Sequence, residues 1–228
     1  MTPSNHASLL LALQHGDSQF PSGSFAFSQG LEASSQLTAE LGPFDFAGFV
    51  MAQLRHRWAI ADRPALARAH RLRDDPDKLA ELDAEVEAST LVEGLRAGSR
   101  RNGVALLTTH ARRGTAGAAD YRARIREGRA LGHLCIVQGL VWGALGLDEE
   151  TAVAISGYQM AASLAAAAVR LGLVGAIEAQ EAISRSLPIV EAALDQEVCP
   201  DEPIRSFVPL AEIAVALHGS SGQRLFSN

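Results

Sequence analysis

Apolar side chains recur every three or four residues along most of the chain, the spacing that places them on one face of an α-helix. No stretch shows the sustained alternation of apolar and polar positions that is typical of a half-buried strand. The pattern therefore predicts an all-α, single-domain helical bundle of about 8–10 helices with short connections. The helices are expected over residues 7–15, 24–37, 43–54, 62–72, 76–91, 131–145, 149–171, 174–197 and 209–218.

Capping residues and glycines refine this pattern. Asp62, two positions before Pro64, is expected to cap the helix that follows it. Residues 95–107 can continue the acidic helix that begins at Pro76. The domain is expected to span residues 1–228, with a C-terminal tail that is flexible from about residue 219. The Gly139-x-x-x-Gly143 pair indicates close helix packing, within the subunit rather than at a dimer interface.

Two neighbouring segments, residues 130–147 and 151–169, contain no charged side chain and are long enough for a transmembrane hairpin. The second is rich in alanine, which gains little from lipid, and no aromatic belt brackets either segment. We therefore interpret both as buried helices and expect no membrane association. Cys135 and Cys199 are expected to be reduced thiols in a cytoplasmic protein.

Composition and charge narrow the function classes. The chain is 47% hydrophobic and only 5% aromatic, which favours a helical core rich in Ala and Leu. The formal net charge is −6, yet residues 96–129 hold nine arginines against Asp120 and Glu127. This run is interpreted either as solvated helix faces or as an Arg-rich helical binding module for an acidic protein. Only Tyr121 interleaves with the arginines, so a nucleic-acid partner is not expected.

The motifs of common enzyme classes are absent from the sequence. Lys78 is the only lysine and follows Asp77, which excludes a P-loop. His133 and Cys135 would point to different faces of a helix, so we assign no metal ligand. A small all-α enzyme with an acid–base site near His15, Asp17 and Glu32 stays open as an alternative to a protein without catalytic activity.

The most unusual stretch is GDSQFPSGSFAFSQGLE, residues 16–32. Pro21 and Gly23 suit a tight turn that leads into a helix. Phe25 and Phe27 fall on different sides of that helix, so one can enter the core while the other meets a partner. Gly30 inside a helix would cost roughly 1 kcal/mol relative to alanine, which indicates close approach by another helix or chain.

This stretch resembles the N-terminal signature of the UreF family of urease accessory proteins, D-S-x-x-P-x-G-x-[FY]-x-x-S-x-G-L-E. Two further segments are similar to family motifs: Gly132-His133, and Arg224-Leu225-Phe226-Ser227 near the C-terminus. The chain departs from the family where Gly219 follows His218, because the family usually has a glutamate there. The matching residues of the signature are Asp17, Ser18, Pro21, Gly23, Phe25, Ser28, Gly30, Leu31 and Glu32.

The resemblance implies a homodimeric, non-catalytic scaffold. Such a protein binds the accessory protein UreD, also called UreH, and recruits the nickel-carrying GTPase UreG. The complex delivers nickel to apo-urease and couples delivery to GTP hydrolysis. No cofactor is expected to be held tightly, and nickel would pass only transiently. The partner-binding residues implied by the resemblance are Phe25, Ser28, Gly30, Leu31, Glu32, His218, Arg224, Leu225 and Phe226.

The tail motif gives the first testable prediction. If the signature and the tail together build a docking face, Arg224→Ala should weaken recruitment of UreG, because arginine is a frequent interface anchor. The homodimer should remain intact. Co-purification with UreG, alongside sedimentation of the variant alone, measures both effects. Normal UreG binding by Arg224→Ala would contradict the assignment.

Overall fold

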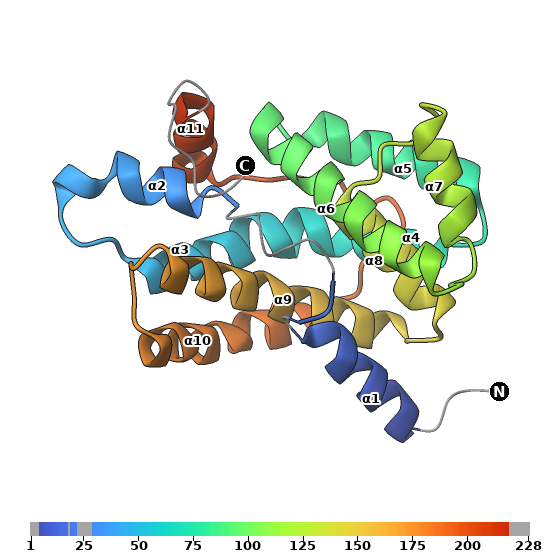
Figure 1. The fold of residues 1–228 in the computed structure, drawn as a ribbon, viewed down its shortest axis with the longest axis horizontal. Coiled ribbons are helices and arrows are strands. Elements are labelled where there is room, and N and C mark those ends of the chain that lie inside the picture. Colours follow the sequence, from blue (N-terminus) through green and yellow to red (C-terminus); the bar gives the residue numbers. More distant parts are fainter. Residues whose placement is uncertain (1–4, 18, 22–28, 219–228) are drawn as a thin grey trace.

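The computed structural model describes residues 5–17, 19–21 and 29–218. These residues form helices and no strand, which confirms the predicted all-α class (Figure 1). The α-helices are α1 (Asn5–Gly16), α2 (Leu31–Leu37), α3 (Phe46–Gln53), α4 (Arg63–Arg71), α5 (Pro76–Ser89), α6 (Glu93–Arg112), α7 (Ala118–Arg126), α8 (Leu134–Ala144), α9 (Glu149–Arg170), α10 (Ala176–Leu194) and α11 (Pro209–His218). A 3₁₀ turn, η2 (Ala39–Leu41), and a π-helical segment, η3 (Leu54–Asp62), complete the described elements.

Helices α3 and α4 are not separate, because η3 joins them into one continuous rod. Asp62 has helical backbone angles and makes no capping bond, so its predicted role as an N-cap is wrong. Counted with this rod as one, the described residues hold ten α-helices, within the predicted range. Asp45, Asp75 and Asp148 cap helix starts instead, each accepting a bond from a backbone N–H three residues later.

Pro64 explains why the rod is irregular. A proline has no N–H, so the carbonyl of Ile60, four residues earlier, loses its usual helical donor. The connection before α11 supplies a replacement: the N–H of Arg205 donates to the oxygen of Ile60 at 3.0 Å. One helical turn earlier, the N–H of Phe207 donates to the oxygen of His56 at 2.8 Å. These two hydrogen bonds join the π-helical segment to residues 205–207, which lead into α11.

Three further expectations differ from the structure. The chain breaks between α5 and α6, where Thr90 is extended, so residues 95–107 belong to a new helix. Helix α7 was not predicted, because its arginines hide the apolar period formed by Ala118, Tyr121 and Ile125. Gly30 lies at the N-cap of α2 with φ 85°, not inside a helix; residues 24–28 of the predicted helix lie outside the described residues.

Small residues set how closely the central helices approach. A Cβ on Gly139 of α8 would lie 2.5 Å from the backbone oxygen of Leu66 on α4. A Cβ on Gly143 would lie 3.0 Å from the ring of His70, also on α4. The Gly139–Gly143 pair therefore packs α8 on α4 within the subunit, as predicted.

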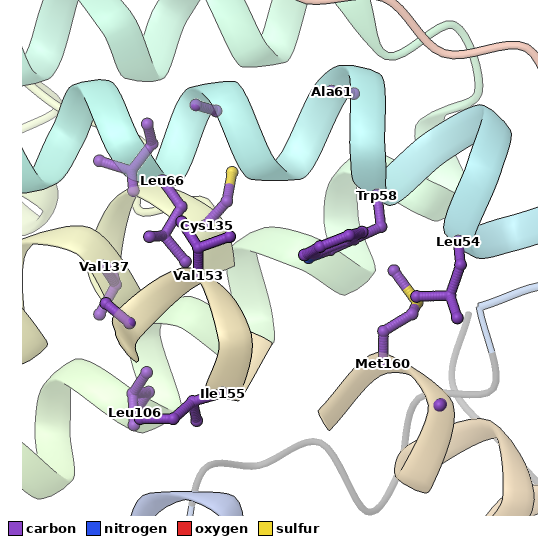
Figure 2. Packing of buried hydrophobic residues seen from close by; sticks show 14 of the residues in the cluster. Leu54, Trp58, Ala61, Leu66, Leu106, Cys135, Val137, Val153, Ile155 and Met160 are labelled. Carbon is purple, nitrogen blue, oxygen red and sulfur yellow. The ribbon is translucent and has the colours of Figure 1, made fainter. Parts of the chain in front are cut away.

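Helix α9 runs through the middle of the molecule. It contacts α1, α4, α8 and α10. In Figure 2 its Met160 lies near Leu54 and Trp58, and its Ile155 lies beside Leu106 in the core. The Trp58 indole N–H donates to Ser156 Oγ at 2.9 Å. By length and composition α9 could cross a membrane, but 61% of that window is buried inside the bundle. Its apolar character is accounted for by its central place.

Candidate functional site

The described end of the N-terminal signature packs against the last helix. Gln29 and Gly30 both have left-handed backbones, with φ 51° and 85°. A Cβ on Gly30 would lie 3.1 Å from side-chain carbons of both Ala211 and Val215 on α11. The close approach expected at Gly30 is therefore made by a helix of the same chain. Because the left-handed conformation also disfavours a Cβ, only glycine fits this contact without strain.

The other predicted docking residues divide into three groups. Leu31 and Glu32 are buried, 0% and 2% exposed, in the first turn of α2. They face the inside of the described chain and do not project from its surface. His218 is the last residue of α11. Phe25, Ser28, Arg224, Leu225 and Phe226 lie outside the described residues, so their predicted roles remain predictions.

Helix α11 presents two different faces. Ala211, Ala214 and Val215 are buried against the body, where α11 contacts α2 and α6. Leu210 and Ile213 are 42% and 55% exposed on the other side. An apolar groove of about 610 Å³ lies beside the start of α11, between it and α3. We call this region, made by α2, α11 and the groove, the α2–α11 face.

A second apolar groove is lined by residues of α1, α9 and α10. Its volume is about 1120 Å³, and alanine is the commonest of its lining residues, at seven of sixteen; Leu13, Tyr158 and Ile183 are among the larger side chains. Leu9, Leu10 and Leu13 of α1 are 56%, 65% and 61% exposed. A ridge of leucines thus stands beside a groove lined by small side chains. We call this region the α1 groove.

The Gly132-His133 segment lies at the centre of a buried hydrogen-bond network. The Asp83 carboxylate accepts bonds from three successive backbone N–H groups: Leu131 at 2.8 Å, Gly132 at 2.6 Å and His133 at 3.0 Å. The hydroxyl of Tyr121 donates to the same carboxylate at 2.9 Å. Burial and the neighbouring Asp83 raise the pKa of Tyr121. The network joins α5 and α7 to the start of α8.

The His133 side chain extends this network to α6. Its Nδ1 lies 3.1 Å from Ser99 Oγ, and its Nε2 lies 2.8 Å from Glu87 Oε2. Burial lowers the pKa of His133. The pKa of Glu87 is also lowered: burial opposes the shift, but hydrogen bonds from Arg100 and His133 prevail. The arrangement fits a structural role, because both ring nitrogens already have partners.

A small cavity of about 50 Å³, with many polar residues in its lining, lies beside the π-helical segment. Arg57 and Asp62 from this segment line it, five residues apart, with Arg57 Nε 3.4 Å from Asp62 Oδ2. Burial raises the pKa of Asp62 against the opposing effect of Arg57. Arg57 Nη1 and Asn102 Nδ2 are buried and have no hydrogen-bond partner among the described residues. The other lining residues are Gln29, Trp58, Ser99, Leu134, Cys135, Gln138, Ser156, Gln159, Met160 and Ser163.

Sequence reasoning missed this cavity. Its polar residues are spread over α6, α8, α9, the π-helical segment and Gln29 before α2, and together they form no motif. The π turn places Arg57 and Asp62 on one face, whereas a regular helix would turn them apart. The proline at position 64 was the available signal, because a proline inside a helical pattern often marks a local irregularity.

The structure does not assemble the acid–base site considered above. His15 is fully buried, and its Nδ1 donates to the oxygen of Leu11 at 2.9 Å. Asp17 is exposed and accepts a bond from the N–H of Gln19. Glu32 is buried at the start of α2. No hydrogen bond or ion pair described for these residues joins one of the three to another.

The arginine run is partly neutralised within the chain. Arg96 and Arg100 pair with Glu87 and Glu93, and Arg124 pairs with Asp77 at 2.6 Å. Arg113 lies over the ring of Phe20, 5.8 Å from its centre. Several arginines of this run therefore interact with side chains of the same chain.

The Asp83 network gives the second prediction. Asp83→Asn replaces an acceptor-only carboxylate by an amide whose NH₂ group opposes backbone donors. The free energy of unfolding should fall by about 3 kcal/mol, measured by urea denaturation. The control is Asp77→Asn, which removes an exposed ion pair on the same helix and should cost less than about 1 kcal/mol. Equal losses for the two variants would contradict the importance given to Asp83.

The chain is similar to known proteins along its whole length. Residues 42–187 match the sequence model of the family described as UreF. A protein from Trichodesmium erythraeum (strain IMS101), named urease accessory protein UreF, is 28% identical, with all of both chains aligned. Proteins of the same name from Yersinia enterocolitica and Yersinia pseudotuberculosis are also 28% identical, covering 98% of this chain and all of theirs. The family match includes Gly132-His133, whereas the N-terminal signature and the tail lie outside it.

Proposed function

The chain belongs to the UreF family of urease accessory proteins, and from this premise we propose that it acts as the scaffold on which the nickel-delivery complex assembles. Members of this family are not enzymes, so the alternative acid–base enzyme at His15, Asp17 and Glu32 is wrong. The proposal concerns how a non-catalytic helical protein contributes to urease maturation.

We propose that the α2–α11 face binds UreD/UreH and UreG. One observation carries this: Gly30 of the signature packs on Ala211 and Val215 of the helix that leads into the tail. The signature and the helix that precedes the tail are far apart in sequence and meet at this place. The exposed Leu210 and Ile213 supply apolar contact area beside them.

In this proposal nickel is the cargo of the assembled complex and not a resident cofactor. The described residues contain no group of three or more His, Cys, Asp or Glu side chains that could hold a metal ion, so no ligand is assigned to this chain. The UreG partner would carry the metal and the nucleotide, because this chain has no P-loop. A cytoplasmic location follows from the same proposal, since apo-urease and its GTPase must be met there.

We propose that the α1 groove forms the homodimer. The occupant is a second copy of this chain, because the exposed leucines of α1 match the alanine-lined groove beside them in size and polarity. A two-fold axis would let each copy insert its leucine ridge into the groove of the other, which gives a closed, self-complementary interface. The α2–α11 faces of both copies would remain available to partners.

The third prediction tests the scaffold. Apo-urease, UreD, nickel-loaded UreG, GTP and bicarbonate are mixed with and without this protein, and urease activity is followed. Activity should appear only when the chain is present, because the other components do not assemble into the delivery complex without a scaffold. The control replaces the chain by an unrelated helical protein at the same concentration. Equal activation without the chain, by partners known to be competent, would contradict the proposal.

The fourth prediction tests the α1 groove. Leu13→Glu places a charge on the groove wall, so the dimer should dissociate at least 100-fold more readily, measured by analytical ultracentrifugation. Leu91→Glu is the matched control, because Leu91 is 73% exposed and lies in the connection between α5 and α6. An unchanged dimer in Leu13→Glu would exclude this groove as the interface.

A further inference from the structure

Two buried histidines tie the end of α1 to the body of the protein. His15 of α1 and His110 of α6 are each 0% exposed, and their rings stack with centres 5.4 Å apart. Phe20 and Trp142 enclose the pair, with ring centres 4.5 Å and 6.3 Å from that of His15. No family motif discussed above includes either histidine.

The hydrogen bonds of the pair define its protonation state. Nδ1 of His15 must carry a proton, because it donates to the carbonyl oxygen of Leu11. Its Nε2 is then a bare acceptor, and this atom has no partner among the described residues. Nδ1 of His110 lies 3.0 Å from the hydroxyl oxygen of Thr115, and its Nε2 is also without a described partner. Both rings are therefore neutral as packed, and each has one nitrogen at which an added proton would find no acceptor.

The surroundings offer nothing to stabilise such a proton. Arg113 follows α6 and is a cation near both rings, and it opposes the protonation of each. From α9, Gln159 donates to the backbone oxygen of His15, and from α8 comes the neutral indole of Trp142. Asp17 is exposed and engaged with the N–H of Gln19. No carboxylate therefore contacts the pair among the described residues.

We propose that the His15–His110 stack is an acid-sensitive latch, which holds α1 and Phe20 against the body when neutral and releases them when protonated. Release would expose the aromatic cage and remove Leu13 from the wall of the α1 groove. Thr109, next to His110, also holds this region, since its hydroxyl donates to the oxygen of Pro21 at 2.8 Å.

The direction of the pH dependence follows from linkage. Burial, His15 and Arg113 lower the pKa of His110 to about 4, and burial lowers that of His15. Because both values lie below the ordinary 6.5, the released state takes up protons first as the pH falls. The latch is fully stable above about pH 6.5 and weakens below it. If release takes up two protons, the equilibrium constant for release of α1 rises by up to about 100-fold for each pH unit that the pH falls.

The test is amide hydrogen exchange of the full chain between pH 7 and 5, corrected for intrinsic rates. Opening of α1 should increase at least 10-fold between pH 6.5 and 5.5, while α8 amides change much less. In His15→Phe/His110→Phe, which keeps the aromatic packing and cannot titrate, α1 opening should not depend on pH. His56→Gln changes an exposed histidine and should behave as the wild type.

An equal pH dependence of α1 opening in the wild type and the double phenylalanine variant would overturn the proposal. A second measurement serves if that variant does not fold. NMR titration of the wild-type histidine ring protons should show His15 and His110 remaining neutral at pH 6 while α1 is packed. Protonation of either ring near pH 6.5 with α1 still protected would also overturn it.

Discussion

One buried carboxylate, that of Asp83 on α5, joins α5 to α7 and to the start of α8. Asp83 accepts four hydrogen bonds, three of them from consecutive N–H groups before α8. An ion cannot be buried without such hydrogen bonds. The segment that leads into α8, residues 131–133, must therefore wrap closely around the carboxylate. Gly132 can adopt this turn because its φ is 83°. Gly103 has no side chain, so the carbonyl of Gly132 can approach the backbone of α6. The position of α8, and with it the packing on α4, follows from this turn.

The sequence predicts those helices whose apolar residues are regularly spaced. The prediction fails where a contact with a distant part of the chain decides the local structure. Helices α8, α9 and α11 begin and end close to their predicted bounds because alanine, leucine and glycine fix both their faces and their ends. Asp62 and Pro64 look like a helix start. The rod continues through them because the N–H of Arg205 replaces the donor that the Ile60 carbonyl lacks. A contact between residues so far apart in sequence cannot be predicted from the local spacing of apolar residues.

The candidate site shows the same division. The signature predicted a close approach at Gly30, and the structure supplies α11 as the approaching helix. Motif matching could not tell that Leu31 and Glu32 are buried, because burial depends on that distant helix. Neither the polar cavity nor the histidine stack could be found from spacing, since each is assembled from side chains of several helices.

The packing of α2 on α11 also bears on how the chain is made. The two helices are separated by most of the length of the sequence, and the ribosome releases the C-terminus last. Leu31 and its neighbours on α2 therefore lack one of their packing partners until α11 has left the exit tunnel. A nascent chain thus carries part of the apolar surface of α2 without its α11 cover while the intervening helices are made, and such exposed surface is prone to aggregation.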